Sequence, residues 1–164
     1  MATAPDDLAA VEEAIYDQSF RTLDEQARVL EGLRARAGTL IGAATVTTAF
    51  VGGLTVSRGS ENPRLDALSW IAIGLYAAVV VLSLLISAPS RKWIFVHHPR
   101  RLLSEYVEPG PPKSLSHFRR SIAYYNGRNY DANGRQLTRL SALFVAAMVV
   151  FVAELILWLS RLAA

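Results

Sequence analysis

Arginines interleaved with tyrosines and asparagines form the part of the sequence best suited to hold a ligand. The candidate binding residues are Arg100, Arg101, Arg119, Arg120, Tyr124, Arg128 and Asn133. A guanidinium group clamps a phosphate through two parallel hydrogen bonds, and an aromatic ring stacks on a base. This composition therefore predicts a site for a nucleotide. The alternative is that these basic side chains contact acidic lipid headgroups at a membrane surface.

Glu154 is the second residue that could carry chemistry, because it is the only charged residue in the apolar run 140–160. An ionised carboxylate inside a membrane is costly unless it is paired or close to water. In one interpretation Glu154 faces a partner or a pore, as in an ion or proton conduit. In the other it is protonated, or bonded to a polar group such as Thr47, Thr48 or Tyr76, and only holds the helices together.

Residues for metal binding or catalysis are scarce. The chain has no cysteine, and the adjacent His97 and His98 rarely suit one ion, while His117 is distant in sequence. No phosphate-binding loop, GxSxG, HExxH or dinucleotide fingerprint occurs. We therefore expect no metal site, no cofactor and no enzymatic activity.

Three apolar runs are long enough to cross a membrane and so to position these residues. Residues 37–56 and 68–88 carry no charge, and 140–160 carries only Glu154. About 20 residues of helix span a hydrocarbon core, and only a helix satisfies its own backbone there. Hydrophobic residues make up 52% of the chain, too many for the buried helices of an ordinary soluble protein. The sequence predicts an all-α membrane helical bundle with three transmembrane helices.

The basic residues predict how the chain crosses the membrane. Of the 17 lysines and arginines, fourteen lie in segments 1–36 and 89–139, and three lie in 57–67 and the C-terminal tail. Cytoplasmic segments carry the excess of positive charge. The N-terminus and 89–139 are therefore expected in the cytoplasm, and the C-terminus outside. No cleavable signal peptide is evident, so the first span would act as an uncleaved anchor.

Segment 1–36 is predicted to be a cytoplasmic amphipathic helix that continues into the first span. Its apolar residues recur every three or four positions, and its polar face carries eight acids. The apolar stripe would pack on other cytoplasmic helices or on a neighbouring subunit. The acids would also suit the ten basic residues of 89–139, so the two segments are candidates to bind each other.

Segment 89–139 is predicted to be a basic cytoplasmic helical segment, which completes a cytoplasmic helical layer. Pro99 suits the first turn of a short helix, and 108–112 (EPGPP) must form a loop. A second long helix is expected from Ser114 into the third span. Gly127 and Gly134 weaken this helix and indicate a hinge, a kink or a close approach of another group.

A stripe of small residues, Gly38, Gly42 and Ala49, enters the first predicted span. Such residues let helices approach closely, and GxxxG is a pairing motif. The stripe predicts close helix packing, either inside the subunit or between copies of the chain.

The sequence LRARAGTLIGAA before the first span resembles the small membrane effectors of the Pycsar type, which are related to SLATT membrane domains. Arg36-Ala37 matches a Lys-Ala pair, and Tyr125 or Tyr130 with Asn133 and RQLTRLSALF matches the later part. Arg34 stands where that pattern usually has Asp. The resemblance covers nearly the whole chain. It implies a bacterial inner-membrane protein of antiphage defence that responds to a cyclic nucleotide by impairing the membrane.

Three functions follow as hypotheses. The first is a homo-oligomeric, cyclic-nucleotide-responsive membrane effector whose other partner is the lipid bilayer and which binds no nucleic acid polymer. The second is a non-enzymatic membrane scaffold or accessory subunit that binds partners through its acidic N-terminal helix. The third is a small ion or proton conduit that uses Glu154.

Overall fold

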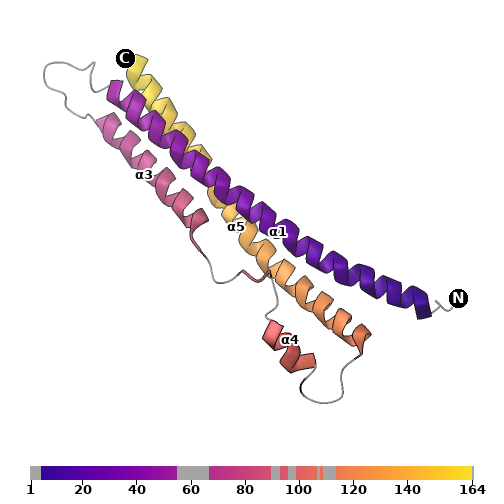
Figure 1. Ribbon diagram of the computed structural model, residues 1–164. Helices are drawn as coiled ribbons and strands as arrows, with labels where there is room; N and C mark the ends of the chain where they lie inside the picture. Colours follow the sequence, from indigo (N-terminus) through magenta and orange to yellow (C-terminus); the bar gives the residue numbers. More distant parts are fainter. Residues whose placement is uncertain are drawn as a thin grey trace. The chain divides into compact units, whose positions relative to one another are not determined.

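Helices make up all the regular secondary structure in the described part of the chain (Figure 1). The computed structural model describes residues 5–54, 67–89, 93–95, 99–106, 108 and 114–163. The elements are α1 (Pro5–Thr47), the π-helix η1 (Thr48–Gly52), α3 (Ala67–Ser87), α4 (Pro99–Tyr106) and α5 (Leu115–Ala163). The prediction of an all-α fold is confirmed for these residues.

The chain divides into two compact units. Unit 1 comprises Met1–Leu30 and Ser90–Leu137, and unit 2 comprises Glu31–Pro89 and Thr138–Ala164. The two long helices, α1 and α5, contribute residues to both units.

In unit 1 some residues of the apolar stripe of α1 are buried and others are exposed. Leu23 and Leu30 are buried, whereas Leu8, Val11 and Ile15 are about half exposed. Hydrogen bonds from α1 to α5 join residues 104 to 108 positions apart. Because this separation is nearly constant, the two helices run in the same direction in this unit.

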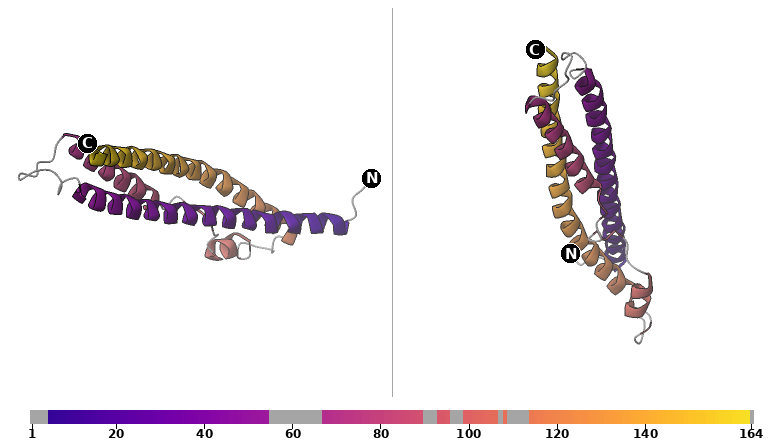
Figure 2. Two further views of the ribbon diagram at one scale, coloured as in Figure 1. Left: turned by 90° about the horizontal axis from the view of Figure 1, so that it is seen from above. Right: turned by 90° about the vertical axis from the view of Figure 1, so that its left-hand side faces the viewer.

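In unit 2 the core is apolar and formed by three helices. Leu40 and Ala44 of α1 pack with Val79 of α3 and Ala147 of α5. A second cluster joins Leu33, Ala37 and Ile86, with Leu140, Leu143 and Phe144 packed against it. Figure 2 shows α3 beside α1 and α5 in this unit. Apolar burial of this kind is the main favourable contribution to helix packing.

Two helices, α3 and α5, are long and apolar enough to cross a membrane. They contain the predicted spans 68–88 and 140–160, except that residue 88 follows α3. The predicted span 37–56 is not a single α-helix, because α1 ends at Thr47 and continues as η1 to Gly52. Residues 55 and 56 lie outside the described part of the chain.

The local features predicted for segment 89–139 are found where the structure describes them. α4 begins at Pro99 as predicted, and Ser114 caps α5 by accepting a hydrogen bond from the His117 backbone N–H at 3.2 Å. Within 108–112 only Glu108 is described, in a turn. α5 continues through Gly127 and Gly134 without a break. At Gly134 an added Cβ would lie 3.6 Å from Gln26 Nε2, an ordinary contact distance, and at Gly127 nothing lies within 4 Å.

Candidate functional site

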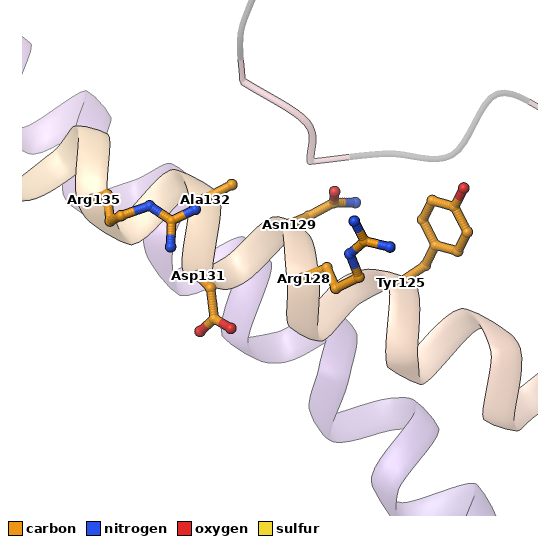
Figure 3. Close-up of a pocket in the computed structure, with 6 residues that line it drawn as sticks. All are labelled: Tyr125, Arg128, Asn129, Asp131, Ala132 and Arg135. Atoms are coloured by element: carbon orange, nitrogen blue, oxygen red, sulfur yellow. The ribbon is translucent and has the colours of Figure 1, made fainter.

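A hollow of about 390 Å³ lies on α5 in unit 1 (Figure 3). The residues that line it are Tyr125, Arg128, Asn129, Asp131, Ala132 and Arg135. Most of them repeat at helical spacing from Tyr125, which places them along one side of α5. In Figure 3 the Arg128 guanidinium group lies between Tyr125 and Asn129, while Asp131 points the other way.

The two arginines of the hollow are its most distinctive feature. Arg128 and Arg135 are both exposed and are seven residues apart, about 10 Å along the helix axis. Neither forms an ion pair within the described ranges. Two guanidinium groups beside an aromatic ring can hold a phosphate-bearing ligand, with the arginines on the anionic groups and Tyr125 against a planar group.

The predicted ligand residues Arg119 and Arg120 are instead paired with acids of α1. Arg119 Nη2 lies 3.2 Å from Glu13 Oε2, and Arg120 donates to Glu12 Oε1 from Nε at 2.7 Å and from Nη2 at 2.5 Å. Hydrogen bonds from Ser116 and then Arg120 hold the pKa of Glu12 below its usual value. The predicted binding between the acidic and basic segments is therefore confirmed in unit 1.

The other predicted ligand residues do not line the hollow. Asn133 is buried and donates from Nδ2 to the Ile94 carbonyl oxygen at 3.1 Å. Tyr124 is 70% exposed, Arg100 is exposed on α4, and the Arg101 side chain lies outside the described part. Of the predicted ligand residues, only Arg128 therefore lines the hollow. Tyr125 and Asn129 belong to the tyrosines and asparagines that interleave with the predicted arginines but were not among the named candidate residues, and Arg135 was not predicted. The helical spacing of these residues was a usable signal.

A buried polar seam joins α1 and α5 behind the hollow in unit 1. Asn126 donates from Nδ2 to Ser19 Oγ at 2.9 Å, and Gln26 donates from Nε2 to the Tyr130 carbonyl oxygen at 3.0 Å. Asn126 and Gln26 are almost completely buried. Hydrogen-bonded polar groups thus occupy positions that are apolar in most helix pairs.

Glu154 is completely buried in unit 2, where Thr48 Oγ1 donates a hydrogen bond to its Oε1. This is the predicted bond to a polar group of a neighbouring span, with Thr48 as the partner. One turn later Trp158 packs against Gly52, since an added Cβ at Gly52 would lie 3.0 Å from Trp158 Cη2. The η1 segment therefore meets α5 at two positions, four residues apart on each side.

The predicted small-residue stripe, which also includes Thr45 and Gly52, meets the described helices only in part. Thr45 contacts Tyr76 of α3 and Gly52 packs against Trp158 of α5. Gly38, Gly42 and Ala49 are exposed, and nothing lies within 4 Å of a Cβ built on either glycine. Packing of the two glycines inside the subunit is thus not found among the described residues. Nearby, Arg34 donates from Nη2 to the Ala88 carbonyl oxygen at 3.4 Å, where its charge complements the C-terminal end of α3.

No group of three or more metal-ligating side chains occurs among the residues whose placement is described. His97 and His98 lie outside them.

Comparisons with protein-family models, curated proteins and solved structures gave no match. The class of protein is therefore stated from the structure alone. In the described residues the chain is an all-helical protein with two candidate membrane-spanning helices, and one of these, α5, carries the hollow with Arg128 and Arg135.

Proposed function

We propose that the chain is a non-enzymatic, multi-pass protein of a bacterial inner membrane that impairs the membrane when it binds a cyclic nucleotide. In this proposal 37–56 is a third span beside those in α3 and α5, and unit 1 is the cytoplasmic sensor. The resemblance to Pycsar-type effectors supports the nucleotide and the role in antiphage defence.

The observation that carries the proposal is the position of the cationic hollow. Arg128 and Arg135 lie on α5, and the same unbroken helix contains the apolar run 140–160. A ligand that bridges both guanidinium groups can therefore act directly on a helix that enters the membrane. It shifts the spans between two states only if it binds one state more tightly than the other.

The parallel direction of α1 and α5 supports the proposed topology. Thr48 and Glu154, which are hydrogen-bonded in unit 2, are 106 positions apart, as are Gly52 and Trp158, which pack together. Both helices therefore run in one direction there, as required if the N-terminus and 89–139 are cytoplasmic and the C-terminus is outside.

Arg119 and Arg120 are secondary candidates in this proposal. Their acidic partners already neutralise them, and a ligand would have to displace Glu12 and Glu13. Exposed ion pairs of this kind contribute at most about 1 kcal/mol, so an anion that binds both arginines could replace them.

The test is release of dye and ions from liposomes that contain the purified full chain, with and without a panel of cyclic nucleotides. We expect release with one nucleotide and loss of that release in Arg128→Ala/Arg135→Ala. The matched control is Arg21→Ala/Arg28→Ala, which removes two exposed arginines that are also seven residues apart but on α1. No release from folded, inserted protein with any nucleotide would refute the effector. Equal loss in both double variants would refute the assigned site.

A membrane scaffold is the second candidate, favoured by the exposed residues Leu8, Val11 and Ile15 on α1. Single exposed apolar residues are common, but three along one side of a helix suit a partner helix. Val11→Lys/Ile15→Lys should then abolish binding of a membrane partner and leave liposome permeability unchanged. Unchanged partner binding in this variant would exclude these residues as the scaffold surface.

A further inference from the structure

The Glu154 carboxyl group in unit 2 is only partly hydrogen-bonded. Its side chain is completely buried, and Oε1 accepts the bond from Thr48 Oγ1. Oε2 is also buried and has no hydrogen-bond partner within the described ranges. A buried oxygen without a partner is uncommon in native proteins and calls for a functional or structural explanation.

Within the part of the chain that the structure describes, no cation forms an ion pair with the Glu154 carboxyl group. Residues 37–54, which include η1, carry no charged side chain. The titratable group on α3 is Tyr76, whose hydroxyl lies 3.1 Å from Thr45 Oγ1, and Arg161 lies seven residues further along α5. One neutral hydroxyl donor compensates a buried neutral acid far better than a buried charge.

A second unsatisfied polar atom lies one helical turn from Glu154. The Trp158 indole interacts with the carboxyl group, but its buried Nε1 has no partner in hydrogen-bond geometry. The acceptor Glu154 Oε2 and the donor Trp158 Nε1 thus lie on adjacent turns of α5 and interact, but without a hydrogen bond of good geometry between them. Such a pair can accept a small hydrogen-bonding species such as a proton carried by water.

The η1 segment fixes this arrangement. A π-helix is rare, is wider than an α-helix, and occurs frequently at functional sites. Here it brings Thr48 to the carboxyl group and Gly52 to the Trp158 ring, and α3 also contacts it.

We propose that Glu154, Thr48 and Trp158 form a proton-binding site in unit 2, where the Glu154 carboxyl group exchanges a proton with water that reaches η1. On uptake, an O–H bond forms at Oε2 with a proton from hydronium, and a water molecule remains. On release the proton returns to water. The inference rests on the membrane placement within the proposed function, but it is independent of the nucleotide.

The test is infrared difference spectroscopy of the full chain in liposomes, between mildly acidic and mildly alkaline buffer. A protonated carboxyl group has its own carbonyl stretch, which disappears on ionisation. We expect such a band in the wild type, its loss in Glu154→Gln, and a shift to higher frequency in Thr48→Val because the carbonyl loses a donor. Glu31→Gln, which alters an exposed acid of unit 2, should keep the band.

Each other outcome overturns the inference. A band that stays constant at every pH and does not shift in deuterated buffer would mean a permanently neutral structural acid. Absence of any band that depends on Glu154 would mean a permanently ionised group. Circular dichroism of each variant verifies its fold before the spectra are compared. A titrating band without nucleotide-triggered release would retain the proton site and refute the effector, so the two proposals fail separately.

Discussion

Replacement of Gly52 by alanine tests whether the π-helix is held by its contact with Trp158. An added Cβ would lie 3.0 Å from Cη2, 3.1 Å from Cζ2 and 3.5 Å from Cζ3 of the indole. Carbon atoms prefer about 3.5 to 4.0 Å, so the contact must open by about half an ångström. The Trp158 side chain is 2% exposed, and its burial leaves little freedom to move away.

Two opposing effects determine how Gly52→Ala changes the free energy of unfolding: overpacking against Trp158 lowers it, and the higher helix propensity of alanine raises it. Extra methyl groups in a packed core cost about 1–3 kcal/mol, while alanine gains up to about 1 kcal/mol over glycine in a helix. Gly52→Ala should therefore lower the free energy of unfolding by about 1–2 kcal/mol.

The neighbouring glycine provides the matched control for this experiment. Gly53 has nothing within 4 Å of an added Cβ and has a helical φ of −59°. Gly53→Ala should raise the free energy of unfolding by about 0.5–1 kcal/mol, so the two variants should differ by about 2 kcal/mol.

Unfolding of both variants by denaturant in a mild detergent, followed by circular dichroism, measures this difference. In a double-mutant cycle, Trp158→Phe removes the outer indole atoms and should recover at least about 1 kcal/mol of the cost of Gly52→Ala. If Gly52→Ala and Gly53→Ala are equally stable, or if the cycle shows no coupling, the contact does not constrain η1 and the argument is refuted.

Three further predictions concern the two units. Because hydrogen bonds from Ser116 and Arg120 lower the pKa of Glu12, its stabilising contribution is present above the ordinary value of 4.5 and is lost as the pH falls through the lower folded value. Arg120→Ala should flatten the acid side of a stability-against-pH curve, and an unchanged curve would contradict this. Asn126→Ala should cost about 1–3 kcal/mol in denaturant unfolding, because it removes a buried donor and leaves its acceptor without that bond. Gly42→Leu should leave the fold unchanged by circular dichroism but weaken self-association in cross-linking of detergent-solubilised protein, and unaltered cross-linking would remove the stripe from the interface between copies.

The helices and their rough positions could be predicted, because long apolar runs and helical periodicity depend mainly on local sequence. The pairing of α1 with the basic segment also followed from charge, and Thr48 was among the expected partners of Glu154. These predictions required only the sign of a charge or the position of a residue along the length of a helix. None of them required the exact direction of a side chain.

The change from α1 to a π-helix within the predicted span 37–56 could not be predicted in the same way. A π-helix at Thr48–Gly52 adds no unusual residue to an apolar run, and its partners Glu154 and Trp158 are more than 100 residues away in sequence. The cationic hollow was predicted only in part, for a related reason. Arg128 was a predicted ligand residue together with Arg119 and Arg120, but Arg135 was not. Charge alone did not show that acids of α1 pair with Arg119 and Arg120.

The contrast between the two units bears on which one can respond to a ligand. The contact of α1 with α5 in unit 1 depends on the hydrogen bonds of Ser19, Gln26 and Asn126, whereas that in unit 2 depends on Leu40 and Ala147. In unit 1, the proposed cytoplasmic part, water can replace a hydrogen bond at a net cost of about 1 kcal/mol. Helices within a membrane are held by close van der Waals packing, because lipid is as apolar as leucine. A ligand at Arg128 and Arg135 is therefore expected to act first on the polar seam of unit 1. Since backbone hydrogen bonds cannot open in lipid, the response is expected to reach unit 2 as movement of intact helices, without local unfolding.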